Sequence, residues 1–340
     1  MKKCLFTLAT LLLILAFALA PASARVVRFG QVAPPWSGDI VGGLEMAKYV
    51  KEKTNGAFEI KIFPSSQLGS MISQLQQVQG GTLEMSVCAS AMLQNTVPQA
   101  AVLDLPFVWP SKETAYAVLA DSEFRAKLSS YMEKKGLAHC GWIQNGWRAI
   151  TNSKRPIRTP EDMKGLKLRV MPSPIYLDTF KLLGVTPVPM AYAEVYQALQ
   201  QKVIDGQDNA AWVSVLMKFA EVNKFMTETG HTFTTGPAIV NLDFWNSLTP
   251  AQQKIFIEGG ELAWKINLEH SEKLKRDMPN SGGKSYEEIC KEQDVQLIKL
   301  SDEERAVFAK AMRPIWDKYR SFIGGEFYDF FMEKIEQHKK

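Results

Sequence analysis

The residue of this chain best suited to binding chemistry is Arg169, near the end of a short stretch of alternating apolar residues. Leu166, Leu168 and Val170 alternate with polar residues, which predicts a strand. A guanidinium group stays charged at any physiological pH and offers two parallel N–H donors to one carboxylate. Arg169 could therefore hold an organic anion at the end of this strand. The alternative is an ordinary surface salt bridge.

Motifs for metal or covalent chemistry are missing from the sequence. There is no C-x-x-C pair and no G-x-S-x-G nucleophile motif. Residues 281–285 are superficially similar to a phosphate-binding loop, but Met278 stands where that motif needs a glycine. These absences do not exclude catalysis, but they favour binding without covalent chemistry, and we expect no cofactor and no metal ion. No metal-binding spacing connects the histidines, which are His139, His231, His270 and His338.

The first 24 residues have the pattern of a secretory signal peptide. Lys2 and Lys3 form a short basic start, and an apolar run of 16 residues follows from Leu5 to Ala20. Small residues at 22–24 complete the pattern and predict cleavage after Ala24. A membrane anchor is the weaker alternative, because a span needs about 20 apolar residues. We therefore expect an exported, soluble protein in the periplasm.

Composition is typical of a globular chain with a full core. Hydrophobic residues make up 46% of the sequence, and the formal net charge of +4 is too small and too dispersed to indicate a nucleic-acid partner. After Ala24 the chain keeps three cysteines, which are Cys88, Cys140 and Cys290. They allow at most one disulfide, and we favour buried free thiols over a disulfide.

The first third of the mature chain alternates strands and helices. The predicted strands cover residues 26–31, 58–62 and 83–87, and the predicted helices cover 39–53 and 71–79. Asp39 is a suitable cap for the first helix, with Val41, Leu44, Ala47 and Val50 on one face. This β-α-β-α-β order is typical of a parallel sheet with helices on its faces.

A similar series starts again in the middle of the chain. Extended segments are predicted at 138–143, 148–151 and 166–170, and helices at 173–183 and 191–202. Two α/β units in one exported chain indicate two lobes. From Pro250 the sequence is strongly helical, with Thr249 as a cap, and further helices are predicted at 302–319 and 326–336.

Several ordered motifs closely resemble those of one protein family. They lie at residues 63–69, 80–85, 105–107, 147–153, 159–170, 187–196 and 205–209. With these motifs the chain resembles the DctP-like extracytoplasmic solute-binding subunits of tripartite ATP-independent periplasmic (TRAP) transporters. The resemblance covers nearly all of the mature chain.

The resemblance implies an α/β fold of two lobes, a Venus-flytrap periplasmic binding protein, with crossing strands and a long helix that bridges the lobes. Lobe one is expected at 25–145 plus 235–274, and lobe two at 146–234 plus 275–340. The implied function is a receptor that binds a small-molecule carboxylate between the lobes and delivers it to a small and a large membrane subunit. Closure on the ligand is expected to be a hinge motion.

The resemblance also implies a set of carboxylate-binding residues. Arg169 matches the family arginine that makes a bidentate contact with the ligand carboxylate. Arg148 matches a second arginine at the same group, although a structural ion pair with Asp208 or Glu194 is the alternative. Asn209 matches an asparagine near the carboxylate, and it could also cap the helix after it.

The expected ligand wall is apolar. Tyr192 matches an aromatic position that packs over the ligand, with core packing as the alternative. The other expected wall residues are Val32, Trp36, Met71, Ala89, Met92, Trp147, Met171 and Trp212. A polyhydroxy acid would leave hydroxyls unpaired against such a wall, at about 1–3 kcal/mol each. We therefore favour an aromatic or apolar monocarboxylate, such as an indole acid, an aromatic 2-oxo acid or an aromatic amino acid.

Other interpretations stay open at this point. A small aliphatic, hydroxy or sugar acid is the alternative ligand, in which case the tryptophans and methionines belong to the core. If the ligand is an amino acid, Asp208 and Glu45 are the candidate partners of its ammonium group. A periplasmic enzyme that uses Asp208 or Glu194 as a base, or a sensory module, is a less favoured function.

Overall fold

The computed structural model describes residues 24–339. The predicted signal peptide therefore lies outside the described residues, apart from Ala24. No helix within residues 24–339 is both long and apolar enough to cross a lipid bilayer.

Lobe one is built on three parallel strands. β1 (Arg25–Gly30) pairs with β2 (Phe58–Phe63) on one side and with β3 (Met85–Val87) on the other. The helices α2 (Gly38–Lys53) and α3 (Met71–Gln79) connect these strands, which confirms the predicted order. The cap of α2 differs from the prediction, because the Ser37 hydroxyl, rather than Asp39, accepts the hydrogen bond from the Ile40 amide.

Lobe two repeats this design with a second parallel group. β5 (Lys167–Val170) lies between β6 (Thr186–Pro189) and β7 (Gly206–Ala210), and it is parallel to both. The connections contain α7 (Pro174–Leu182) and α8 (Val195–Gln200). The predicted helix at 191–202 is shorter than expected, because its first residues form a separate 3-10 turn, η3 (Tyr192–Glu194).

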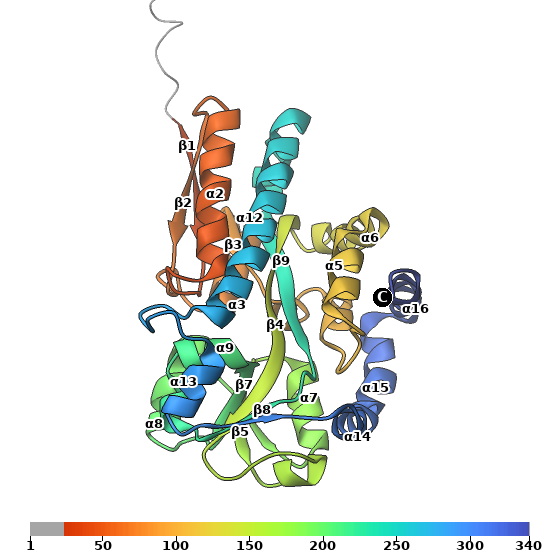
Figure 1. The fold of residues 1–340 in the computed structure, drawn as a ribbon. Helices are drawn as coiled ribbons and strands as arrows, with labels where there is room; N and C mark the ends of the chain where they lie inside the picture. Colours follow the sequence, from red (N-terminus) through yellow and green to blue (C-terminus); the bar gives the residue numbers. More distant parts are fainter. Residues whose placement is uncertain (1–23, 340) are drawn as a thin grey trace, which may run out of the picture.

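Two long antiparallel strands join the lobes into one sheet (Figure 1). β4 (Leu137–Asn152) pairs with β9 (Phe233–Asn241) over most of its length and then with β7 and β8 (Phe225–Glu228). β9 in turn pairs with β3, so the sheet order is β2-β1-β3-β9-β4-β7-β5-β6. The two extended segments predicted at 138–143 and 148–151 are therefore one strand with register shifts in it.

The long helix α12 (Pro250–Arg276) connects the two lobes on one face of the sheet. It begins at the predicted cap, Thr249, with a complete capping box. Near its start, the Phe256 ring lies 5.5 Å from the Phe58 ring in the core of lobe one. Near its end, Leu274 belongs to a buried cluster with Trp212 of lobe two. One helix thus has side chains in the cores of both lobes.

Glycines allow α12 to approach β4 and α2 closely. A Cβ atom at Gly260 would lie 1.9 Å from the Cys140 carbonyl oxygen, and one at Gly42 would lie 2.4 Å from the Ala263 carbonyl oxygen. This close packing explains why the predicted apolar face of α2 is wrong in part. The helix turns Gly42 and Met46 toward the core, whereas Leu44 is exposed.

The C-terminal helices run along one side of both lobes (Figure 1). The predicted helix at 302–319 is two helices, α14 (Asp302–Met312) and α15 (Pro314–Ile323), because Pro314 starts a new helix and cannot continue the old one. α14 contacts α7 of lobe two, whereas α16 (Gly325–Gln337) contacts α5 (Lys112–Ala120) of lobe one. The lobe boundaries given above stay predictions.

The remaining elements complete the two lobes and the core between them. All three cysteines after Ala24 are buried and unpaired.

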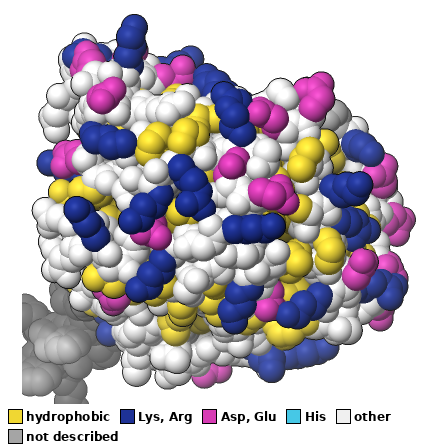
Figure 2. All heavy atoms as spheres, turned by 90° about the horizontal axis from the view of Figure 1, so that it is seen from below, with side chains coloured by type: hydrophobic (Ala, Val, Ile, Leu, Met, Phe, Trp, Pro, Cys, Tyr) yellow, Lys and Arg dark blue, Asp and Glu magenta, His cyan; other side chains and the backbone are white. Residues whose placement is uncertain are grey.

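Figure 2 shows the end of lobe two, where basic side chains are spread over the surface with acidic ones among them. The elements not yet named are α4 (Ser90–Leu93), η1 (Pro98–Asp104), α6 (Ser122–Glu133), η2 (Pro160–Met163), α9 (Ala211–Leu216), α10 (Phe219–Val222), α11 (Leu242–Asn246), α13 (Tyr286–Glu292) and β10 (Gln296–Lys299).

The close contact between α12 and β4 leads to a stability prediction. We expect Gly260→Ala to lower the free energy of unfolding by about 1–3 kcal/mol, because the new methyl group has to push α12 off the backbone of β4. Thermal and denaturant unfolding measure the effect. Gly259→Ala is the control, since its Cβ meets side chains rather than backbone, those of Met46 at 3.1 Å, Val50 at 3.3 Å and Tyr49 at 3.5 Å. Equal stability of the two variants would contradict this prediction.

Candidate ligand-binding site

A cavity of about 330 Å³ lies between the two lobes. Its walls come from the segments that follow the carboxyl ends of parallel strands β1 and β3 in lobe one and β5, β6 and β7 in lobe two. Ligands of open α/β sheets bind outside the carboxyl ends of their strands. The crossing strand β4 adds residues from both lobes to the same cavity, so a ligand there touches both halves of the protein.

Arg169 lines this cavity from the end of β5, and its side chain is buried. Its Nε donates a hydrogen bond to the Met190 carbonyl oxygen at 3.0 Å. Among the described residues, no carboxylate forms an ion pair with it, and its two terminal nitrogens donate no hydrogen bond. Burial lowers the pKa of Arg169 to about 10. The group is therefore a cation at neutral pH, and its two terminal nitrogens can donate to a ligand.

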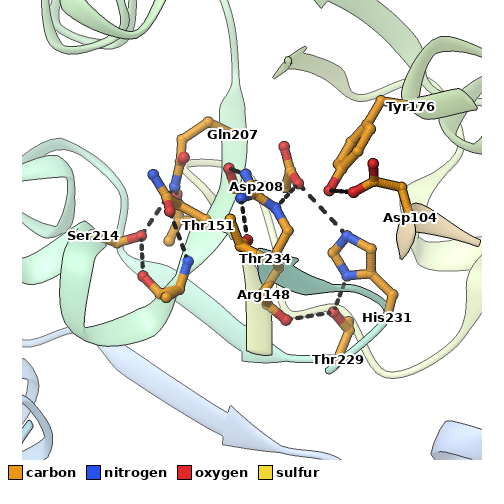
Figure 3. A network of polar contacts seen from close by, with 12 residues as sticks. Asp104, Arg148, Thr151, Tyr176, Gln207, Asp208, Ser214, Thr229, His231 and Thr234 are labelled. Carbon is orange, nitrogen blue, oxygen red and sulfur yellow. Dashed lines mark hydrogen bonds and ion pairs between the residues drawn. The ribbon is translucent and has the colours of Figure 1, made fainter. Parts of the chain in front are cut away.

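Arg148 also lines the cavity, but the protein itself compensates its charge (Figure 3). Its Nε donates to the Asp208 carboxylate, and one terminal nitrogen donates to the Thr234 hydroxyl at 2.9 Å. Its other terminal nitrogen donates to the Asp208 carbonyl oxygen. The ion pair that the sequence left open as an alternative is thus present. Arg148 still lines the cavity together with Arg169, so both guanidinium groups are available to a ligand there.

Asp208 is not part of the cavity wall, and its carboxylate lies between Arg148 and His231 (Figure 3). Burial opposes its ionisation, but Arg148 and His231 hold the pKa of its carboxyl well below the usual range. The Nε2 atom of His231 lies 3.6 Å from that carboxylate, and burial lowers the pKa of this histidine. Asp208 is therefore a fixed counter-ion of Arg148. Its predicted contact with a ligand ammonium stays a prediction.

A second buried acid completes this network. Asp104 accepts a hydrogen bond from the Tyr176 hydroxyl at 3.4 Å, and burial raises its pKa to about 7. The guanidinium carbon of Arg148 lies 5.6 Å from the Tyr176 ring centroid, in reach of a cation–π contact. These neighbours fix the position of Arg148 before any ligand binds.

Asn209 and Tyr192 lie in the wall beside the arginines. The Asn209 side-chain oxygen accepts a hydrogen bond from the Ala210 amide at 2.9 Å. Ala210 is itself the N-cap of α9, and no side chain caps that helix, so the capping alternative is not observed. The Asn209 amide nitrogen has no partner among the described residues, so it can still donate to a ligand oxygen. Tyr192 packs edge-on against Phe219 at 6.4 Å and also faces the cavity.

Most of the predicted wall residues surround the cavity. The Trp212 indole nitrogen donates to the Asn145 carbonyl oxygen at 3.2 Å, which fixes the orientation of its ring. The predicted residues found in the cavity wall are Val32, Trp36, Met71, Ala89, Met92, Met171, Tyr192 and Trp212.

Two predicted site residues lie elsewhere. Trp147 is not in the cavity wall, and its ring packs edge-on against Phe233 at 5.1 Å. Side chains alternate along a strand, and Trp147 precedes Arg148 on β4, so the two neighbours point to opposite faces. Glu45 lies outside the cavity wall on α2, where it forms an ion pair with Lys48. The structure thus does not bring Trp147 and Glu45 together with the other predicted site residues.

The sequence analysis missed several polar residues of the cavity wall. They are Gln31, Ser37, Asp39, Ser66, Ser70, Asn145 and Thr234. Asp39 is 8% exposed, accepts a hydrogen bond from the Asn267 amide at 2.7 Å, and has its pKa raised by burial to about 7. A signal for it existed in the sequence: Ser37 is an equally good helix cap two residues earlier, which leaves Asp39 without that role.

Within residues 24–339, no group of three or more His, Cys, Asp or Glu side chains is arranged to hold a metal ion.

A model of the family described as "Bacterial extracellular solute-binding protein, family 7" (DctP) matches residues 29–321. The chain belongs to this family. The 2,3-diketo-L-gulonate-binding periplasmic protein YiaO of Escherichia coli (strain K12) is 32% identical over 271 residues, which cover 78% of this chain and 82% of that protein. The C4-dicarboxylate-binding periplasmic protein DctP of Rhodobacter capsulatus is 30% identical over 313 residues and 90% of each chain.

Solved structures agree with this family membership. A TRAP periplasmic solute binding protein from Desulfovibrio salexigens, solved with bound orotic acid, is 30% identical. It superposes with a TM-score of 0.85 over 92% of this chain and 99% of that one. The DctP resemblance and the two-lobed periplasmic binding fold expected from the sequence are thereby confirmed.

The buried acid Asp39 leads to a pH-dependent stability prediction for this DctP-family chain. Because its pKa is about 7 in the folded state, against an ordinary value of 3.8, the wild type loses stability as the pH rises through this interval. Asp39→Asn keeps the acceptor for Asn267 and removes the titration. We expect the variant to gain stability on the order of 1–3 kcal/mol at pH 8 and almost none at pH 4.

Scanning calorimetry at the two pH values measures this difference. Asp104 titrates in the same interval in both proteins, so the variant is always compared with the wild type at one pH. Glu45→Gln is the control, since that side chain is 40% exposed on the same helix. An Asp39→Asn effect that is the same at pH 4 and pH 8 would contradict the prediction.

Proposed function

We propose that this protein is the extracytoplasmic receptor of a TRAP transporter for an organic monocarboxylate, with an aromatic or apolar acid as the favoured ligand. The observation that carries the proposal is the Arg169 guanidinium, buried at the cavity with no carboxylate partner. In this proposal Arg169 and Arg148 hold the ligand carboxylate, and the free Asn209 amide donates to one of its oxygens.

The charge of Arg169 favours an anion over a neutral ligand. An unpaired buried charge costs several kcal/mol, and a ligand carboxylate supplies the missing partner with two parallel hydrogen bonds. Arg148 is already paired with Asp208, so the two arginines and one acid leave one positive charge for the ligand. This balance supports a single carboxylate at this end of the cavity.

The apolar wall supports an aromatic or apolar ligand body. Trp36 and Trp212 line the cavity together with Met71 and Met92, and an aromatic ring packed among such groups buries about 150–250 Å². Orotic acid, present in the Desulfovibrio salexigens relative, is a planar ring with one carboxylate. Because that relative is similar to this chain, its ligand supports an acid with a ring.

A small aliphatic, hydroxy or sugar acid is the second candidate. The names of the two relatives described above favour it, because one is a 2,3-diketo-L-gulonate-binding protein and the other a C4-dicarboxylate-binding protein. The arginine contacts are the same for both candidates. The difference lies in the wall, where a polyhydroxy acid needs polar partners that Val32, Met71, Ala89 and Met92 do not offer.

Receptor function without turnover fits the chemistry of Asp208, one of the two acids considered as a base. Asp208 is held as a carboxylate by Arg148 and lies outside the cavity wall, so it is a poor general base. Glu194, the other candidate, lines the cavity. In the proposed cycle, export through the signal peptide, cleaved after Ala24, brings the protein to the periplasm. There the lobes close on the acid and present it to the small and large membrane subunits.

The anion anchor leads to a binding prediction. We expect Arg169→Ala to weaken the binding of organic acids by a few kcal/mol, which is at least a hundredfold in Kd, while the fold stays intact. Titration calorimetry with a ligand found by thermal-shift screening measures the change. Arg125→Ala is the matched control, because Arg125 pairs with Glu261 outside the cavity. Near-normal affinity of the Arg169 variant would reject this residue as the anchor.

The tryptophans provide a separate test of the ligand class. We expect Trp212→Ala to weaken aromatic acids by about tenfold or more and acids of the size of acetate much less, because only the larger ligands reach this ring. Trp147→Ala is the control, since that ring lies outside the cavity wall and packs on Phe233. Equal losses for both ligand sizes remove Trp212 from the site and favour the small-acid candidate.

A further inference from the structure

The cavity has a second polar end in lobe one, which offers hydrogen-bond acceptors, whereas the arginines offer donors. Asp39 in the first turn of α2 and Gln31 just after β1 both line the cavity. The Gln31 amide nitrogen donates to the Asp39 carbonyl oxygen at 3.4 Å, which connects the two residues. No Lys, Arg or His within residues 24–339 forms an ion pair with Asp39.

The hydrogen bonds at this end leave acceptors unused. The Gln31 side-chain oxygen is buried and has no hydrogen-bond partner among the described residues. One oxygen of Asp39 accepts from the Asn267 amide at 2.7 Å, and the other has no partner in the described part of the chain. A buried acceptor without a donor costs about 1–3 kcal/mol. The Gln31 oxygen is such a buried acceptor, and Asp39 adds a second oxygen that is free to accept at the same end of the cavity. Together they indicate that the ligand brings the donor.

We propose that Asp39 and Gln31 bind an N–H or O–H group at the end of the ligand far from its carboxylate. The inference rests on the proposed function, because it takes the Arg169 end as the carboxylate site. It narrows the ligand to a bifunctional acid: a carboxylate, an apolar or aromatic middle, and a hydrogen-bond donor at the distal end. Indole acids and hydroxyphenyl acids have this design.

Tyr192 lies within electrostatic reach of both ends of the cavity. Burial raises the pKa of Tyr192, while Arg169 lowers it and Asp39 raises it, so the charges of both ends act on this group. The apolar side chains of Met71, Met92 and Trp212 line the same cavity. In this proposal a ligand with one ring places its polar groups at the two ends and its apolar body against these side chains.

The side chain of Gln31 decides the direction of the hydrogen bond. Burial raises the pKa of Asp39 to about 7, so near neutral pH its carboxyl can both accept and donate. The unpaired atom of Gln31 is an oxygen and can only accept. A ligand donor satisfies both residues, whereas a ligand carbonyl would leave the Gln31 oxygen unpaired.

Matched acids that differ in one donor test this inference. The probes are indole-3-acetate against 1-methylindole-3-acetate, and 3-(4-hydroxyphenyl)propanoate against 3-phenylpropanoate, titrated into the mature protein by calorimetry. We expect the donor-bearing acid of at least one pair to bind about tenfold tighter or more. In Asp39→Asn the free side-chain group becomes a donor, and in Gln31→Met the acceptor is lost, so this preference should fall to about threefold or less.

Controls separate this inference from the function on which it rests. Glu45→Gln, on the same helix but outside the cavity, should keep the wild-type preference. Binding without any donor preference, or a preference that both Asp39→Asn and Gln31→Met retain, overturns the inference and leaves the proposed function standing. No binding of any of the four acids contradicts the proposed aromatic ligand and the inference with it. Gln31→Met gives an independent answer if Asp39→Asn fails to fold.

Discussion

A buried guanidinium without a carboxylate partner is the constraint on which this site depends. Arg169 keeps its charge inside the protein, where one hydrogen bond to a backbone oxygen does not neutralise it. Asp208 neutralises the neighbouring Arg148, whereas no carboxylate of the described residues pairs with Arg169. An anion from outside completes the arrangement, and this asymmetry gives both affinity and selection for acids.

The fold keeps these groups in position and still lets the halves move. β4 carries Arg148 and runs through both lobes, while α12 has side chains in the cores of both. A continuous strand and a continuous helix therefore connect the two lobes, and such connections are suited to bending rather than sliding. A ligand that touches lobe one at Asp39 and lobe two at Arg169 favours the closed form over the open form.

Local patterns in the sequence predicted the first three strands with their helices and the long helix α12, whereas α5, α6 and the strands β6 to β10 were not predicted. Periodicity and caps placed α3 and α12, and the family motifs placed Arg169, Asn209 and Tyr192 at the cavity. β9 was not predicted, because all its residues are buried and Pro237 interrupts its pattern. Asp39 was interpreted as a cap, since nothing local reveals that Asn267, far along the chain, holds it beside the ligand cavity.

A crystal structure of the protein with its co-purified or screened acid tests the central claim most directly. The account predicts that the ligand carboxylate accepts two parallel hydrogen bonds from the terminal nitrogens of Arg169, with both lobes in contact with the ligand. A bound acid whose carboxylate lies elsewhere, with Arg169 turned to solvent or paired with a protein carboxylate, would contradict it.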